Sequence, residues 1–252
     1  MELVLLTALG VGGATVIGAL LGFLFKTTSH KFSDMVLSFA AGVMMCAAVV
    51  GLILPSLESG NPFSVLVTAA GIFVGALALN IIDKLVPHLH RMVGADQEAH
   101  PDATVKVDKI LLFVLAIAIH NFPEGISAGV GFGGGSTADA LTIAGGIALQ
   151  NIPEGMVIIA PMLAAGISRG RTFLIAAATG VIEIIGTLLG YFAVSISAAI
   201  LPFSLAFAGG TMLYIISDEM IPETHAHGNE RCATYALLAG FCLMLAVDFF
   251  LG

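Results

Sequence analysis

The chain has 252 residues, of which 58% are hydrophobic and only 10% are charged, and its mean hydropathy is +1.04. A soluble globular domain carries about 25% charged residues, so this composition excludes a water-soluble globule. Nine Lys and Arg against 17 Asp and Glu leave a net charge of −8. Because no basic cluster is present to neutralise a phosphate backbone, nucleic acid is excluded as an expected partner.

Eight apolar runs are long enough to cross a bilayer, since a spanning helix needs about 20 mostly apolar residues. They lie near residues 3–25, 34–57, 63–86, 109–131, 137–166, 172–196, 201–222 and 232–251. We therefore expect an all-α polytopic membrane protein in which residues 1–252 form a single transmembrane transport domain. The first run follows no basic segment and is longer than the apolar part of a signal peptide, which favours a retained helix.

The positions of the cations predict the orientation, because Lys and Arg near helix ends stay on the cytoplasmic side. All nine lie at the ends that follow the first, third, fifth and seventh runs. They are Lys26, Lys31, Lys84, Arg91, Lys106, Lys109, Arg169, Arg171 and Arg231. An even number of spans with both termini outside satisfies this pattern.

The long polar stretch 87–108 follows the third run and contains His88, His90 and His100 together with several acids. Its position predicts a cytoplasmic, His-bearing loop. Two interpretations stay open, a solvated linker and a weak metal-binding tract, because imidazoles and carboxylates together bind transition metals.

A six-residue pattern occurs twice, as His-Asn-Phe-Pro-Glu-Gly at 120–125 and as Gln-Asn-Ile-Pro-Glu-Gly at 150–155. An ionisable residue inside a membrane helix costs about 2.5–3.5 kcal/mol, so it is a functional-site hypothesis by default. In each pattern the first, second and fifth residues share one helical face. Because a short loop near 132–136 joins the two helices, we expect them to be antiparallel and the two faces to meet at the bilayer midplane.

The polar side chains of the two patterns are candidate metal ligands. They are His120, Asn121 and Glu124 in the first and Gln150, Asn151 and Glu154 in the second. Glu183, in the middle of the sixth run, adds a third carboxylate. One imidazole with carboxylates and amides, and no thiolate, suits a divalent first-row metal better than Cu⁺. Three carboxylates carry enough charge to share two divalent cations.

The prolines of the two patterns predict irregular backbone. Pro123 and Pro153 lack an N–H, so the carbonyl groups of Ile119 and Leu149 lose their usual partners. At membrane depth, irregular backbone is tolerated where it is buried in protein or lines a wet cavity. We therefore expect a kink at each pattern, facing a pathway.

The two patterns, Glu183 and the segment Asp-Glu-Met-Ile-Pro-Glu-Thr-His at 218–225 resemble the Zrt/Irt-like (ZIP) family of metal transporters, particularly its prokaryotic members. The resemblance covers essentially the whole chain. It implies eight helices in a 3+2+3 arrangement in the cell (inner) membrane, with helices 1–3 and 6–8 as inverted repeats around the central pair. It also implies import of divalent metal ions into the cytoplasm, zinc first, with iron, manganese, cadmium and cobalt as further candidates.

By motif position, the resemblance implies two adjacent metal sites. The first contains His120, Glu124, Gln150 and Glu154, and the second contains Asn121, Asn151 and Glu183 and shares Glu124 and Glu154. The implied cytoplasmic exit is lined by Asp83, His88, His90, Glu223 and His225, whereas Glu58 is a weaker candidate at the outer mouth. Members of the family often have His in place of Gln150 or an acid in place of Asn151, so this chain has fewer charged ligands there.

Two alternatives stay open. His120 and Glu124 on one helical face are partly similar to zinc hydrolases, although the HExxH pattern is absent, so one alternative is an intramembrane metal-dependent hydrolase. The other is a metal-selective channel with the same ligands. The metal would be the transported substrate, and no organic cofactor is expected. Expected partners are membrane lipid and divalent metal ions, and a homodimer is compatible with the sequence.

Overall fold

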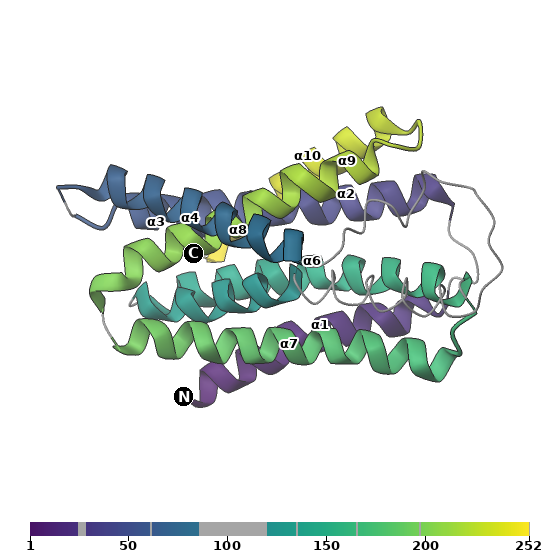
Figure 1. Cartoon of the computed structure of the whole chain (residues 1–252), viewed down its shortest axis with the longest axis horizontal. Helices are drawn as coiled ribbons and strands as arrows, with labels where there is room; N and C mark the ends of the chain where they lie inside the picture. The colour runs from purple at the N-terminus through teal and green to yellow at the C-terminus, as the bar shows by residue number, and fades with distance from the viewer. Residues whose placement is uncertain are drawn as a thin grey trace.

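The computed structural model describes residues 1–24, 29–60, 62–85, 120–134, 136–164, 166–196 and 198–251. These residues form helices and short connections, and no strand occurs among them. Seven of the helices are long and apolar enough to cross a membrane (Figure 1). The expected all-α polytopic class is confirmed. Seven of the eight expected runs correspond to these helices, and the remaining run, 109–131, is described only from residue 120.

The helix bounds follow the apolar runs with local adjustments. The helices are α1 (Glu2–Gly22), α2 (His30–Cys46), α3 (Leu54–Leu57), α4 (Ser64–Leu85), the segment 120–131, α6 (Thr137–Ala164), α7 (Arg169–Ile196), α8 (Leu201–Ile215), α9 (Ile221–Thr224) and α10 (Glu230–Leu251). Helix α2 begins at His30 rather than near residue 34, because the Ser29 hydroxyl accepts a hydrogen bond from the Phe32 N–H at 3.2 Å and caps the helix.

Two of the spans contain a π-helical segment before a proline. Helix α2 continues through Ala47–Ile53 into α3, and α8 continues through Ile216–Met220 into α9. Pro55 and Pro222 cannot donate to the carbonyl groups four residues earlier, and those carbonyls lie within the π segments. Helix α6, in contrast, runs through its two internal prolines as one α-helix. The π-helical segments thus lie in the second and seventh spans, whereas the segment 120–131 and α6 stay α-helical through Pro123 and Pro153, where the sequence predicts a kink.

A first packing group contains α1, the segment 120–131, α6 and α7. Helix α1 lies against α6 and α7. Glycines bring these helices into backbone contact, because a Cβ at Gly18 would collide with the carbonyl oxygen of Ile152, and one at Gly125 with that of Glu183. These glycines are therefore required by the close approach of two backbones, as in other small-residue contacts between membrane helices.

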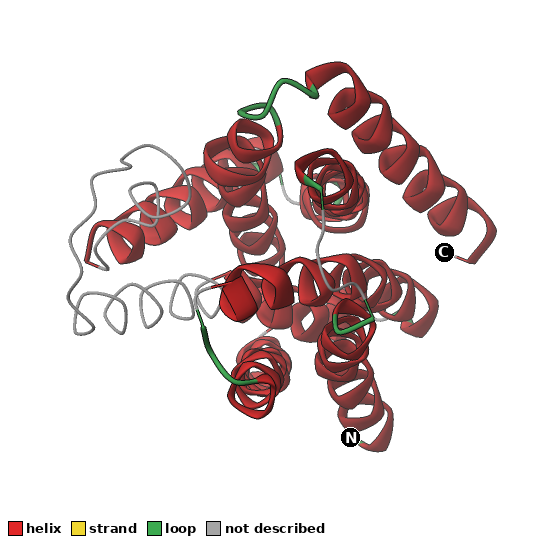
Figure 2. Cartoon of the chain, turned by 90° about the vertical axis from the view of Figure 1, so that its right-hand side faces the viewer, coloured by secondary structure: helices red, strands yellow, loops and turns green. Residues whose placement is uncertain are grey.

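A second packing group contains α2, α4, α8 and α10. Helix α2 lies against α10, and α4 lies against α8. Here too the backbones touch, because a Cβ at Gly42 would meet the carbonyl oxygen of Leu237 and one at Gly210 that of Ile72. Figure 2 shows the bundle from the end where α2 and α7 begin.

At Gly51 and Gly146, the contact between the two groups is made with side chains. A Cβ at Gly51 on the second span would lie 2.8 Å from the Ile143 side chain on α6, and one at Gly146 would lie 2.7 Å from the Met244 side chain on α10. Large buried side chains of the core extend across this contact; they include Met44, Leu52, Ile147 and Met212. The described contacts between the two groups thus involve mainly apolar side chains, and close backbone approaches at glycines occur within each group.

Candidate metal centre

The first packing group brings the two repeated patterns and Glu183 together. Glu124 is 1% exposed and Glu183 is 0% exposed. Electrostatic interactions connect Glu124 with Glu154 and Glu183, and Glu154 with His120. The structure therefore places side chains from the segment 120–131, α6 and α7 in one buried polar cluster, as the antiparallel arrangement of the two patterns predicts.

The Glu183 carboxylate is held by three donors from three different helices. Its Oε1 accepts hydrogen bonds from the Thr15 hydroxyl, at 2.7 Å, and from the Asn121 amide. Its Oε2 accepts one from Nδ2 of Asn151 at 2.6 Å. The amides of both patterns thus act as donors to this carboxylate.

Three oxygen atoms in the cluster are buried without a donor among the described residues. Glu124 Oε1 accepts from Nε2 of Gln150 at 2.8 Å, but Glu124 Oε2 has no partner. The amide oxygens of Gln150 and Asn151 are likewise buried and unpartnered. Buried polar atoms are almost always satisfied, so a set of neighbouring acceptors without donors is the chemistry of a cation site.

His120 points to a partner that the sequence analysis did not include among the site residues. Its Nε2 lies 2.7 Å from Oε2 of Glu219, and the two side chains are 22% and 19% exposed. Glu219 belongs to the π segment of the seventh span. In the sequence, Glu219 and Glu223 are both acids near the end of an apolar run, so the sequence does not distinguish them. A π segment changes which helix face each residue occupies, and the apolar pattern does not predict that change.

Carboxylates and imidazoles alone do not complete a metal site in this arrangement. Within the ranges given above, no three His, Cys, Asp or Glu side chains are grouped so that they could hold a metal ion. The amide oxygens of Gln150 and Asn151 are further candidate ligands beside the acids.

Only some of the residues expected at the cytoplasmic exit lie in the described part of the chain. Asp83 lies in α4 but its side chain is outside the described part, as are His88, His90 and the loop 87–108. Glu223 is partly buried at the end of the seventh span. His225 Nδ1 lies 2.8 Å from the Ile221 carbonyl oxygen and Nε2 lies 3.3 Å from the Thr234 hydroxyl. Glu58 is exposed after α3, at the opposite end of its span from the α2 start.

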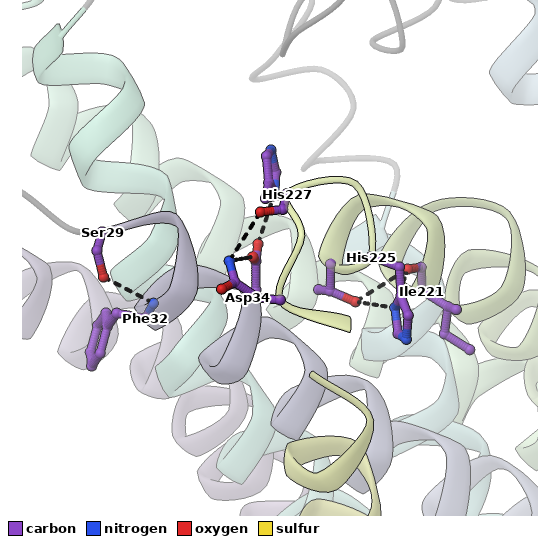
Figure 3. A network of polar contacts seen from close by, with 8 residues as sticks. Ser29, Phe32, Asp34, Ile221, His225 and His227 are labelled. Atoms are coloured by element: carbon purple, nitrogen blue, oxygen red, sulfur yellow. Dashed lines mark hydrogen bonds and ion pairs between the residues drawn. The ribbon is translucent and has the colours of Figure 1, made fainter. Parts of the chain in front are cut away.

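A separate polar network joins the start of α2 to the connection between α9 and α10 (Figure 3). Asp34, 3% exposed, has Oδ1 at 3.0 Å from Nδ1 of His227 and Oδ2 at 3.0 Å from Nδ2 of Asn229. The ring of His30 stacks on His227 with centroids 4.5 Å apart. We call these four residues the α2 latch.

Comparison with known proteins identifies the family of the chain. The family described as ZIP zinc transporter matches residues 91–248. The chain belongs to the ZIP family. It is 41% identical over 254 residues to the zinc transporter GufA of Myxococcus xanthus, covering 98% of both chains. It is 38% identical to the zinc transporter ZIPB of Bordetella bronchiseptica, covering 95% of this chain and 78% of that one. The zinc transporter ZupT of Chlorobaculum parvum is 34% identical, with 92% and 91% covered.

Membership of the ZIP family decides between the classes considered above. Together with the membrane-spanning helices, it makes the chain a multi-pass membrane transport protein and not an enzyme. Neither the hydrolase nor the channel alternative has support among these relatives, each of which is named a zinc transporter.

Proposed function

We propose that this ZIP protein imports divalent transition metal ions, zinc first, across the inner membrane through a buried site formed by the two repeated patterns. The observation that carries the proposal is the set of three buried acceptor oxygens, on Glu124, Gln150 and Asn151, that have no donor in the described part of the chain. Divalent cations at the two adjacent subsites would satisfy them, with Gln150 in the first, Asn151 in the second and Glu124 in both, whereas leaving them unpaired is costly at this depth.

The two subsites implied by the motif positions use different ligands. The first consists of His120, Glu124, Gln150 and Glu154, and the second of Asn121, Asn151 and Glu183 with Glu124 and Glu154 shared. At the second subsite an Asn amide that now donates to Glu183 would turn its oxygen toward the cation. Amide oxygens are neutral ligands, so zinc binding here is weaker than at a site built from His and acids, and manganese, iron, cadmium and cobalt are competitors.

The helix packing supports the 3+2+3 arrangement. Under inverted repeats that relate helices 1–3 to 6–8, the contact of the second span with the eighth corresponds to that of the seventh with the third. Both contacts are present, as α2 with α10 and α8 with α4. The second and seventh spans also share a π segment followed by a proline. The repeats therefore account for features that are far apart in the chain.

We place both termini outside. Helices α2, α7 and α10 begin at the end of the bundle opposite to the two termini (Figure 1). The first turns of these helices contain cations, namely Lys31, Arg169, Arg171 and Arg231. Cations at helix ends favour the cytoplasmic side, so the opposite end faces outward.

We propose that the metal ion leaves the site between His120 and Glu219. It then passes residues on the cytoplasmic side, namely Asp83, His88, His90, Glu223 and His225. The partial exposure of the His120 and Glu219 side chains, compared with the fully buried Glu124, supports this order.

Lipid contact is supported by large apolar side chains on the outer faces of α4 and α10, such as Phe73 and Phe249. A homodimer stays a prediction, to be checked by the mass of the protein in detergent.

The test is uptake of radioactive zinc into liposomes that contain the purified protein. We expect Glu124→Gln to abolish saturable uptake, because it removes the charge of the acid whose oxygen lacks a donor, while the matched variant Glu2→Gln at the start of α1 transports normally. Competition by manganese, iron, cadmium and cobalt gives the metal order. Normal uptake by Glu124→Gln would remove this cluster from the transport path.

A further inference from the structure

Helix α1 contributes a polar side chain to the buried cluster that no motif of the sequence identifies. Thr15 is 1% exposed, and its hydroxyl donates to Glu183 Oε1 at 2.7 Å. The Val11 carbonyl oxygen, one turn earlier, lies 3.3 Å from the Asn151 amide nitrogen. The same face of α1 therefore contacts both the acid and one amide of the second subsite.

The position of Thr15 is determined by backbone contacts on both sides of it. Gly12 is so close to Gly180 on α7 that a Cβ on either would collide with the other's carbonyl oxygen. A Cβ at Gly18 would likewise collide with the carbonyl oxygen of Ile152 on α6, and a Cβ at Gly155 would collide with the carbonyl oxygen of Thr15 itself. Thr15 thus sits where α1 touches α6 and α7 at once, and these contacts fix the position of its backbone beside Glu183.

The three donors to Glu183 differ in what they can do when a cation arrives. Asn121 and Asn151 have both an NH₂ group and a carbonyl oxygen, so each can exchange its hydrogen bond for a metal contact by turning its amide. The Thr15 hydroxyl has one proton to donate, and a carboxylate oxygen that accepts it keeps lone pairs for a cation. The Thr15 hydrogen bond is therefore compatible with both the loaded and the empty second subsite.

We infer that Thr15 is a positioning residue of the second subsite, which holds the Glu183 carboxylate in place while the two asparagines exchange between donating to it and binding the metal. This inference rests on the proposed function. It assigns α1 a part in metal binding that neither the repeated patterns nor the exit residues include.

The experiment is zinc binding to the purified protein by equilibrium dialysis, together with uptake kinetics in liposomes. Thr15→Val keeps the shape of the side chain and removes the hydroxyl, and Thr15→Ser restores the hydroxyl. We expect Thr15→Val to weaken the second zinc ion about tenfold, as loss of a charge-assisted hydrogen bond does, to leave the first ion unchanged and to raise KM more than it lowers the maximal rate. Thr15→Ser should bind zinc as the unmodified chain does.

A double-mutant cycle separates positioning from a general packing effect. If Thr15 acts through Glu183, adding Thr15→Val to Glu183→Gln produces no further loss of the second zinc ion. Additive losses, or wild-type binding by Thr15→Val, would overturn the inference. Failure of the proposed function gives a different result, namely no zinc uptake by the unmodified protein or full uptake by Glu124→Gln, whatever the Thr15 variants do.

Discussion

At the scale of single residues, the cluster is defined by the balance of donors and acceptors around its acids. Glu183 accepts from three protein donors, whereas Glu124 Oε2 and two amide oxygens accept from none of the residues that the structure describes. The acids are therefore not equivalent. Of these two acids, Glu124 has a carboxylate oxygen that can contact a cation without displacing a hydrogen bond from a described residue.

Replacing Asn151 by an acid should increase the dependence of the fold on metal. In Asn151→Asp, the amide that donates to Glu183 Oε2 is replaced by a carboxylate. Two carboxylates then lie side by side in a buried position, because Asn151 is 1% exposed and Glu183 is 0% exposed. We expect this variant to unfold at a lower temperature without zinc and to gain more from added zinc than the unmodified protein, because it binds zinc more tightly.

The measurement for that prediction is the thermal unfolding midpoint in detergent at several zinc concentrations. Asn80→Asp is the control, since Asn80 donates to the Tyr214 hydroxyl at 2.8 Å, on the contact between α4 and α8. An equal zinc-dependent shift in Asn151→Asp and in the unmodified chain would show that residue 151 does not contact the cation.

At the scale of elements, glycine contacts should dominate the stability of the first packing group. A Cβ at Gly155 would collide with the Thr15 carbonyl oxygen, whereas one at Gly145, on the same helix α6, meets nothing within 4 Å. We expect Gly155→Ala to destabilise the protein by about 1–3 kcal/mol, as overpacking does, and Gly145→Ala to be neutral or slightly stabilising. Thermal unfolding of the two variants checks this, and equal midpoints would contradict the backbone contact.

The α2 latch is a second element whose removal can be measured. Asp34→Ala leaves His227 and Asn229 without their buried acceptor, so we expect a loss of about 1–3 kcal/mol and faster proteolysis of the connection between α9 and α10. Glu230→Ala, at the exposed start of α10, serves as the matched control. Cleavage of Asp34→Ala at the same rate as of the control would mean that the latch does not hold this connection.

The spans could be predicted from the sequence because twenty apolar residues in a row have few other interpretations. The polar cluster could be predicted because its residues recur in a pattern. The π segments could not, since Pro55 and Pro222 follow them but Pro153 and Pro161 lie in a regular helix. Thr15 and Glu219 were missed for a related reason: their roles depend on which helix packs next to theirs, and a single chain's periodicity contains no such information.

At the scale of the whole molecule, the packing groups indicate which helices move together. All seven residues of the two proposed subsites lie on the first group, from His120 to Glu183, and backbone contacts hold its helices together. The second group contacts them through side chains, which can slide more easily than interlocked backbones. We therefore expect alternating access to move one group against the other, rather than helices 1–3 against helices 6–8.

Cross-links test this division in a chain whose native cysteines have been replaced. Gly51→Cys with Ile143→Cys joins the two groups, because a Cβ at Gly51 would lie 2.8 Å from the Ile143 side chain. Ser56→Cys with Thr68→Cys lies within the second group, where the two hydroxyl oxygens are 2.8 Å apart. We expect oxidation to stop zinc uptake in the first variant only, with recovery on reduction. Uptake that survives in both would mean that the groups do not move apart.

The three hydrogen bonds to Glu183 also bear on how the protein is made. Because Thr15, Asn121 and Asn151 satisfy this buried carboxylate from within the chain, its helices can associate during membrane insertion before any ion is bound. Biosynthesis of the transporter then does not depend on its own cargo. A cell starved of zinc, which is the cell that requires an importer, can still assemble one.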